Sequence, residues 1–263
     1  MDKHDLYELC VQSVEHLAPL LRAIHGGQPT MLGEDFCGTA ALSRRWCELK
    51  EGATALGVDL DPEALARCPE TPGVRLVQDD VRSVSDPVDV LFVGNFSIGY
   101  HHTRAELVSY LTHARARMNP GGVFVCDTYG GESAFLTGAV HRPHPIPKSL
   151  DGVGGRICRY TWEQRHADPL TGMVTDVIHF RVEDCGEIVE EIPDAFVYEW
   201  RLWSVPELRD AMAEAGFART DVYAGLADAV DDDGNAYVTP VADAESELDD
   251  SFIVLVAGRA PGS

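Results

Sequence analysis

The 263-residue sequence predicts a doubly wound α/β fold, in which helices cover both faces of an open, largely parallel sheet. Two observations predict it. Short apolar runs alternate with helical stretches between Thr30 and Asp127, and each run is made of consecutive Val, Leu and Phe residues. Strands buried on both faces have this continuous apolar composition, whereas half-exposed strands alternate apolar and polar residues.

The elements of the first half follow one another along the chain. A helix is expected over residues 5–24, where apolar residues recur every three or four positions until Gly26 and Gly27 end it. The expected strands are residues 30–35, 53–59, 74–78, 88–94 and 123–127. Helices are expected near residues 40–49, 62–67 and 104–118.

The alternation stops after Asp127, which indicates an insertion. Residues 130–147 resemble a loop rich in Gly and Pro, and strands are expected over residues 156–164, 173–182, 187–192 and 195–203. A capping-box pattern at Ser204–Glu207 then opens a helix that ends at Gly216, and strands 217–223 and 252–257 complete the parent sheet. The expected domains are a covering helix (1–27), a parent domain (28–127 and 204–263) and an inserted antiparallel β-sheet (128–203).

The charge balance excludes several classes of partner. With 43 acidic and 21 basic residues, a net charge of -22 and no basic patch, the chain is not expected to bind nucleic acid or an anionic membrane. Ten of the acids lie between residues 221 and 250, a stretch without Lys or Arg. The seven cysteines contain no CxxC pair, and no run is long and apolar enough to span a membrane. We therefore expect a cytoplasmic protein with reduced thiols, either a monomer or a homodimer.

A turn of small residues follows the first strand and leads directly into a helix. Such a turn lets a ligand approach the backbone and meet the helix N-terminus. Twenty-one residues after Gly38, Asp59 ends the second strand, a spacing that suits a carboxylate accepting hydrogen bonds from the hydroxyls of a ribose. Asp61 and Pro62 are instead expected as N-cap and first residue of the next helix.

These residues resemble motifs of the class I S-adenosylmethionine-dependent methyltransferases. Cys37-Gly38-Thr39 is similar to the core of the family's first motif, as in its glycine N-methyltransferase-like branch, although Phe36 and Ala40 stand where small residues or Gly are usual. Gln78-Asp79-Asp80-Val81 resembles the third motif, Val88–Ser97 the fourth, and Asn119–Val125 the Pro-Gly-Gly turn and fifth strand.

The resemblance implies a Rossmann-like, seven-stranded sheet whose last strand is antiparallel, with S-adenosylmethionine as cofactor and S-adenosylhomocysteine as product. Within it, Asp59 would bind the ribose, Leu60 would pack on the adenine, and Asp80, or Asp79 in the other register, would meet the adenine amino group. The implied cofactor contacts are Glu34, Phe36, Cys37, Gly38, Thr39, Ala40, Asp59, Leu60, Asp80, Val81 and Asn95.

Methyl transfer from a sulfonium requires alignment and a desolvated pocket, and an amine or hydroxyl nucleophile must also lose a proton. Tyr100, His101 and His102 follow the fourth strand, and a neutral histidine is a suitable base near pH 7. We name His101, with Tyr100, as the catalytic candidate; the alternative is a solvated loop before the helix at Arg104.

Aromatic residues are the candidates for contact with the methyl acceptor. Tyr129 and Glu132 follow the expected fifth strand, and Trp162, Tyr198 and Trp200 belong to aromatic stripes in the inserted strands. Such stripes either form a core or hold a ring or an ammonium group. His141 and His144 lie among prolines that prevent a helix from aligning them, so no metal site is expected.

The predicted function is therefore S-adenosylmethionine-dependent methylation of a small molecule, with a slight preference for an amine nucleophile. Methylation of a phenol or carboxylate oxygen remains open, as do a non-catalytic S-adenosylmethionine-binding regulator and an NAD-dependent oxidoreductase. The oxidoreductase would normally carry a GxGxxG turn and a Tyr-x-x-x-Lys dyad, and neither occurs in the sequence.

Overall fold

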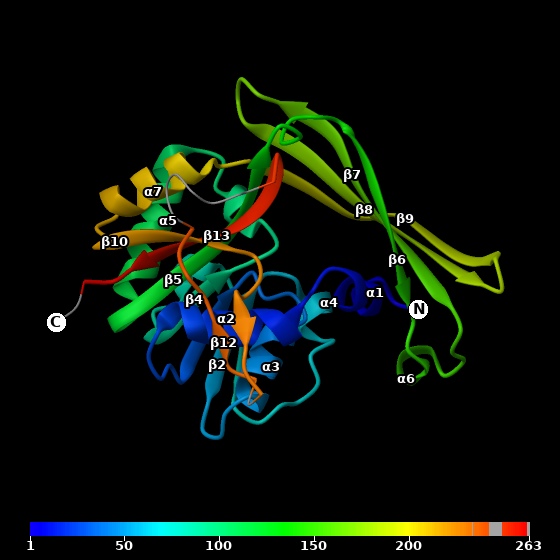
Figure 1. The fold of residues 1–263 in the computed structure, drawn as a ribbon, viewed down its shortest axis with the longest axis horizontal. Coiled ribbons are helices and arrows are strands. Elements are labelled where there is room, and N and C mark those ends of the chain that lie inside the picture. Colours follow the sequence, from blue (N-terminus) through cyan, green and yellow to red (C-terminus); the bar gives the residue numbers. More distant parts are fainter. Residues whose placement is uncertain (233, 242–248, 262–263) are drawn as a thin grey trace. The chain divides into compact units, whose positions relative to one another are not determined.

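The computed structural model describes residues 1–232, 234–241 and 249–261, shown as a ribbon in Figure 1. The chain divides into two compact units. Unit 1 consists of Met1–Gln12 and Phe135–Leu202, and unit 2 of Ser13–Ala134 and Trp203–Ser263. Unit 1 therefore combines the first residues of the chain with most of the expected insertion.

Unit 2 is built on a seven-stranded sheet with the order β10-β13-β5-β4-β1-β2-β3. Its strands are β1 (Met31–Asp35), β2 (Thr54–Asp59), β3 (Val74–Gln78), β4 (Val88–Val93), β5 (Met118–Gly131), β10 (Arg219–Ala224) and β13 (Ser251–Arg259). Strands β1 to β5 pair in parallel, and β13 pairs antiparallel with both β5 and β10. The predicted doubly wound sheet with an antiparallel last strand is confirmed.

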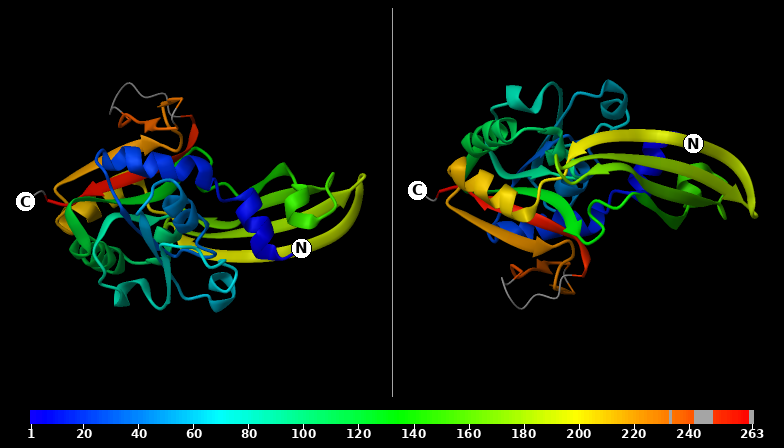
Figure 2. Two further views of the ribbon diagram at one scale, coloured as in Figure 1. Left: turned by 90° about the horizontal axis from the view of Figure 1, so that it is seen from below. Right: turned by 90° about the horizontal axis from the view of Figure 1, so that it is seen from above.

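Helices cover both faces of this sheet, as the two views in Figure 2 show. They are α2 (Val14–His25), α3 (Ala41–Glu48), α4 (Pro62–Leu65), α5 (Arg104–Ala116) and α7 (Val205–Glu214), with short 3₁₀ turns at Val81–Ser83 and Ser97–Tyr100. Leu111 and Leu208 pack with Phe124 in one apolar cluster, and Leu21 and Trp46 belong to the cluster on the other face. Strands β2 and β4 consist mostly of buried apolar residues because both of their faces are covered.

The N-terminal helix differs from the expectation of one helix over residues 5–24. The structure has two helices, α1 (Lys3–Cys10) and α2, separated at Val11–Ser13. The apolar stripe continues across the break at helical spacing, but its halves serve different cores: Leu6 belongs to the cluster of unit 1 and Leu20 to that of unit 2. Periodicity alone cannot show this division, because both halves have the same period.

Unit 1 contains a four-stranded antiparallel sheet with the order β6-β7-β8-β9, together with α1 and the short helix α6 (Lys148–Asp151). Its strands are β6 (Gly138–Pro145), β7 (Ile157–Asp168), β8 (Met173–Asp184) and β9 (Glu187–Arg201).

Two expectations for this sheet were wrong. Residues 138–145 form a strand rather than a loop, because β6 lies at the edge of the sheet, where prolines need not donate to a ladder. Residues 187–192 and 195–203 do not form two strands; β9 runs through Pro193 and Asp194, and a register shift against β8 with a left-handed Asp194 (φ 47°) absorbs the irregularity.

Local capping signals are confirmed. Ser204 and Glu207 form a reciprocal capping box on α7, and the Asp61 side chain accepts from the backbone N–H of Glu63 at the start of α4. Within the acidic stretch 221–250, β11 (Ala229–Val230) and β12 (Ala236–Tyr237) form a small ladder, while Asp233 and residues 242–248 lie outside the described residues. Among the described helices, none has the length and apolar composition required to cross a bilayer.

Candidate functional site

The candidate site lies at the carboxyl ends of the parallel strands of unit 2. Strands β1, β2 and β4 end in Asp35, Asp59 and Val93, and ligands of open α/β sheets bind beyond this edge. The topology therefore brings together the turn after β1, Asp59, the residues after β3 and the loop after β4, which the sequence placed far apart.

The turn after β1 is held in an unusual backbone conformation. Phe36 (φ 60°), Gly38 (φ 55°) and Ala40 (φ 55°) all lie in the left-handed region, which favours glycine. The Cys37 amide donates to the Val58 carbonyl at 3.0 Å and the Ala40 amide to the Cys37 carbonyl at 2.9 Å. Both departures from the family pattern, Phe36 and Ala40, thus occupy strained positions, and strain of this kind concentrates at functional sites.

Asp59 connects the end of β2 to this turn. Its Oδ2 accepts from the Gly38 amide at 2.7 Å and its Oδ1 from the Asp61 amide at 2.9 Å. A carboxylate oxygen has two acceptor positions, so each oxygen retains capacity for a ligand hydroxyl. The next residue, Leu60, is a large apolar side chain that is 65 % exposed.

Glu34 has a different environment from the other predicted contacts. Its side chain is buried, and Oε2 accepts from the backbone amide of Ser43 at 2.9 Å and from the Ser43 hydroxyl at 2.6 Å. Burial raises the pKa of Glu34 to about 7, against the opposing effect of these hydrogen bonds. Glu34 therefore ties the first turn of α3 to β1.

The residues after β3 form a capped 3₁₀ turn. Asp80 accepts from the backbone amide of Arg82 at 2.9 Å and pairs with its guanidinium at 2.5 Å, and the Arg82 contact lowers the pKa of Asp80 to about 2. Val81 is buried. Asp79, the alternative in the other register, accepts from the Asp80 amide at 2.7 Å and is exposed.

The loop after β4 depends on an acid that the sequence reading did not assign. Asn95 (φ 53°) and Phe96 (φ 61°) are consecutive left-handed residues, and their amides donate to Oδ2 and Oδ1 of Asp127 at 2.8 and 2.7 Å. Burial raises the pKa of Asp127 to about 7. The ring of Phe96 meets Tyr129 edge-on at 4.9 Å. Asp127 thus fixes the loop that carries Asn95.

His101 is buried rather than solvated. Its ring stacks on Tyr110 at 4.4 Å and lies edge-on to Phe36 at 6.2 Å, while Tyr100 stacks on Phe36 at 5.7 Å. Desolvation lowers the pKa of His101 to about 4, and its Nε2 has no hydrogen-bond partner among the described residues. The imidazole is therefore neutral near pH 7 and offers an unused polar atom.

A buried ion pair supports this aromatic group. Tyr110 donates from its hydroxyl to Asp35 Oδ2 at 2.7 Å, and Arg117 Nη1 donates to both Asp35 oxygens at 2.9 Å. Asp35 and Arg117 are almost fully buried. The sequence patterns did not identify Asp35, Tyr110, Arg117 or Asp127. For the two acids, the available signal was that each ends an expected strand, 30–35 or 123–127; in the structure β1 ends at Asp35, whereas β5 continues to Gly131.

The arrangement fits the adenosine end of a nucleoside cofactor. It offers a carboxylate at a glycine turn and an exposed apolar side chain beside it in Leu60. Separately from these two features, two buried polar atoms have no partner in the described chain, Thr39 Oγ1 and His101 Nε2. Buried polar atoms normally have partners, so these two are suited to meeting a ligand or water.

The candidate acceptor residues are divided between the units. Tyr129 belongs to unit 2, whereas Trp162, Tyr198 and Trp200 belong to unit 1. The rings of Tyr198 and Trp200 stack with centroids 4.4 Å apart. Trp162 pairs across the strands with Ile178, which pairs with Phe196, so Trp162 lies on the same face of the sheet as Tyr198 and Trp200.

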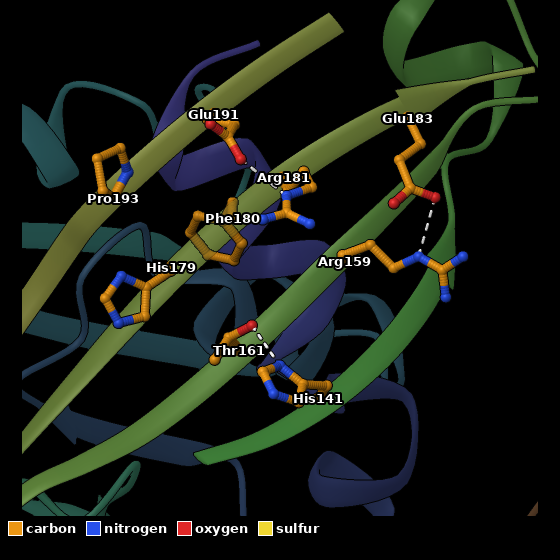
Figure 3. Close-up of a pocket in the computed structure, with 9 residues that line it drawn as sticks. All are labelled: His141, Arg159, Thr161, His179, Phe180, Arg181, Glu183, Glu191 and Pro193. Carbon is orange, nitrogen blue, oxygen red and sulfur yellow. Dashed lines mark hydrogen bonds and ion pairs between the residues drawn. The ribbon is translucent and has the colours of Figure 1, made fainter. Parts of the chain in front are cut away.

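The opposite face of the unit 1 sheet has a groove of about 530 Å³, whose lining residues include histidines, arginines and glutamates (Figure 3). Its arginines are paired across strands, Arg159 with Glu183 at 3.0 Å and Arg181 with Glu191 at 2.8 Å. His141 lies here against Thr161, and strand alternation places His144 on the other face. No group of three or more metal-ligating side chains occurs in the described part of the chain.

No family model and no curated protein sequence matches this chain. Solved structures do match. An S-adenosylmethionine-dependent methyltransferase from Clostridium acetobutylicum has 16 % identity and a TM-score of 0.63, covering 98 % of this chain and 97 % of its own. The sugar N-methyltransferase KedS8 from Streptoalloteichus has 17 % identity and a TM-score of 0.67, covering 97 % and 91 %. The amino pentose methyltransferase CalS10 from Micromonospora echinaspora, solved with S-adenosylmethionine bound, has 19 % identity and a TM-score of 0.66, covering 97 % and 95 %. The chain therefore has the Rossmann-like fold of the class I S-adenosylmethionine-dependent methyltransferases.

Proposed function

We propose that the protein is a methyltransferase that uses S-adenosylmethionine to methylate a small molecule, with an amine as the preferred acceptor. The observation that carries the proposal is the position of Asp59, whose carboxylate holds the Gly38 turn and keeps acceptor capacity for two vicinal hydroxyls. The negative net charge of -22 argues against a nucleic-acid acceptor.

The bound cofactor would supply an activated methyl group on a sulfonium. The residues of this chain would bind and orient it: Asp59 accepts from the ribose hydroxyls, Leu60 covers the adenine, and the Asp80–Val81 turn bounds the adenine edge. Thr39 presents a buried hydroxyl to the polar end of the cofactor. Asn95 would face the reacting group from a loop that Asp127 holds in place.

His101 would act on the acceptor rather than on the cofactor. Because its pKa is lowered to about 4, the ring is a weak base but a neutral hydrogen-bond acceptor over the whole physiological range. A neutral Nε2 can orient an amine through one of its N–H groups and leave the nitrogen lone pair available for in-line attack. Tyr100, which stacks on Phe36, would close one side of the same group of rings.

Support for an amine acceptor comes from two sources. Neighbours of the same fold are a sugar N-methyltransferase and an amino pentose methyltransferase. In addition, Trp162, Tyr198 and Trp200 share one face of the unit 1 sheet, where the half-buried Tyr198 stacks on the buried Trp200, and aromatic faces attract ammonium groups and sugar rings. The alternative is an oxygen acceptor, a phenol or a carboxylate, and the acceptor screen must distinguish it from an amine.

Calorimetric titration with S-adenosylmethionine, S-adenosylhomocysteine and NAD tests the cofactor. Asp59→Ala should weaken binding of S-adenosylmethionine by about 1–3 kcal/mol, because a buried hydroxyl pair loses its acceptor. Asp61→Ala is the matched control, since that carboxylate caps α4 and should leave affinity unchanged. Binding of NAD alone, or equal affinity in the Asp59 variant, would overturn the assignment.

A mass-spectrometric screen tests the acceptor. Amines, amino sugars, phenols and carboxylates are incubated with the protein and S-adenosylmethionine, and products are scored for the gain of one methyl group and formation of S-adenosylhomocysteine. Methylation only of phenols or carboxylates would reject the amine preference while retaining the activity. Cofactor binding without turnover on any class would favour a regulator.

A further inference from the structure

Two cysteines from distant parts of the sequence meet in unit 1. Cys10 is the last residue of α1 and Cys158 is the second residue of β7, and their sulfur atoms lie 3.6 Å apart although the residues are 148 positions apart. Cys158 is completely buried, whereas Cys10 is partly exposed. Neither residue belongs to the proposed cofactor or acceptor site.

The packing of α1 on the sheet holds the two sulfur atoms close together. Leu6 of α1 lies in the same buried cluster as Cys158 and Phe180. His4 and Tyr7 place their rings against Phe196 of β9, with centroid distances of 5.4 and 5.0 Å. The helix is thus seated on the sheet by several side chains, so the approach of Cys10 to Cys158 follows from packing on both sides.

We propose that Cys10 and Cys158 form a redox-active dithiol, a modification site at which a hydroperoxide converts the two thiols into a disulfide that locks α1 to the sheet. A disulfide has a sulfur–sulfur distance of about 2.05 Å, so the sulfurs must approach by roughly 1.5 Å. Rotation of the Cys10 side chain at the end of its helix can supply that movement.

The reaction has two balanced steps. Cys10, which solvent reaches, is oxidised by hydrogen peroxide to a sulfenic acid with release of one water. The sulfur of Cys158 then attacks the sulfur of Cys10, the S–O bond breaks, and a second water leaves with the proton of the Cys158 thiol. Each sulfur loses one electron, and the two peroxide oxygens gain both.

The hydrogen bond between the thiols affects the two steps in opposite directions. It lowers the pKa of Cys158, whose sulfur attacks in the second step, and raises the pKa of Cys10, which is oxidised in the first. The raised pKa of Cys10 makes the first step slow, and we expect disulfide formation to need a sustained excess of peroxide rather than a trace.

Peptide mapping of the full-length protein tests the proposal. The reduced protein is treated with hydrogen peroxide, remaining thiols are blocked with N-ethylmaleimide, and trypsin releases Cys10 in peptide 4–22 and Cys158 in peptide 157–159. The expected product joins these two peptides, lacks two hydrogen atoms relative to their sum, and separates on reduction. Cys10→Ser should abolish it completely, and Cys47→Ser, at a partly exposed cysteine on α3, should leave its yield unchanged.

Hydrogen exchange supplies a second readout, which does not depend on peptide mapping. Amides of α1 should exchange more slowly in the oxidised than in the reduced protein, and the difference should be absent in Cys10→Ser. Recovery of Cys10 and Cys158 as separate maleimide adducts after oxidation would overturn the proposal. Oxidation confined to the exposed Cys185 would overturn it as well.

Discussion

Replacement of Arg117 by Met should strongly destabilise unit 2. In the native protein Arg117 Nη1 donates to both oxygens of Asp35 at 2.9 Å, and the two side chains are 1 % and 0 % exposed. Methionine retains much of the apolar volume but removes the cation. Among the described residues, Asp35 then keeps the Tyr110 hydroxyl, at 2.7 Å, as its side-chain donor and remains a buried carboxylate.

The expected magnitude follows from that burial. Removing one partner of a fully buried ion pair typically costs about 3–5 kcal/mol, because the remaining charge loses its compensation. For a domain of this size, about 1 kcal/mol changes Tm by roughly 2–4 °C, which corresponds to a decrease of about 6–20 °C. Arg115→Met is the matched control: it removes a single hydrogen bond from Nε to the Ala215 carbonyl and should cost about 1 kcal/mol.

Urea denaturation followed by circular dichroism, at pH 5 and pH 8, measures the stability cost of Arg117→Met and the direction in which this cost changes with pH. Desolvation already raises the pKa of Asp35, and loss of Arg117 removes the main opposing interaction. A carboxyl group whose pKa is higher in the folded state loses stability as pH rises, so the cost of Arg117→Met should be greater at pH 8 than at pH 5.

A second substitution tests whether Arg117 stabilises the protein by compensating the charge of Asp35. Asp35→Asn combined with Arg117→Met leaves no buried charge, and this double variant should regain a large part of the stability lost in the single variant. A single-variant cost below about 1 kcal/mol, or a double variant no more stable than Arg117→Met alone, would show that the pair is not the buried charge compensation described here.

Three further predictions concern the candidate site. Glu34→Gln keeps both acceptor contacts to Ser43 but cannot ionise. Because the folded-state pKa of Glu34 is raised to about 7, the free energy of unfolding of the wild type should fall between about pH 4 and pH 7, and that of the variant should fall less. Urea titrations at several pH values measure this difference. Ala40→Gly relieves a left-handed alanine and should be neutral or stabilising by up to about 1 kcal/mol in the same assay, and a clear loss would contradict the strain argument. His101→Phe retains stacking on Tyr110 but removes Nε2; kcat should fall by about 10²-fold with unchanged affinity for S-adenosylmethionine, and unchanged kcat would exclude His101 from the reaction.

Much of the fold could be predicted because its signals are local. Continuous apolar runs predicted the buried parallel strands, and the capping patterns at Asp61 and Ser204 predicted where two helices begin. Each of these signals depends on a few neighbouring residues and on no distant partner. The same holds for the spacing from Gly38 to Asp59, which the structure turns into a hydrogen bond of 2.7 Å.

The failures lie where a local pattern has two tertiary outcomes. The apolar stripe from Leu6 to Ile24 has one helical period, but its halves pack in different clusters, so only the tertiary structure decides that two helices form. The prolines of β6 are tolerated because the strand lies at an edge, and edge position is a property of the assembled sheet.

By itself, the sequence determined the doubly wound sheet, the order of its elements and the acid at the end of β2, because periodicity, capping and strand ends are written in short stretches of chain. Only the tertiary structure decided that His101 is buried against Tyr110, that Arg117 compensates Asp35, and that Asp127 holds the loop of Asn95. The pKa of a buried histidine or carboxyl group depends on desolvation and on its partners, which lie 32 residues away for Asp127 and 82 for Asp35, and these surroundings exist only after the chain has folded.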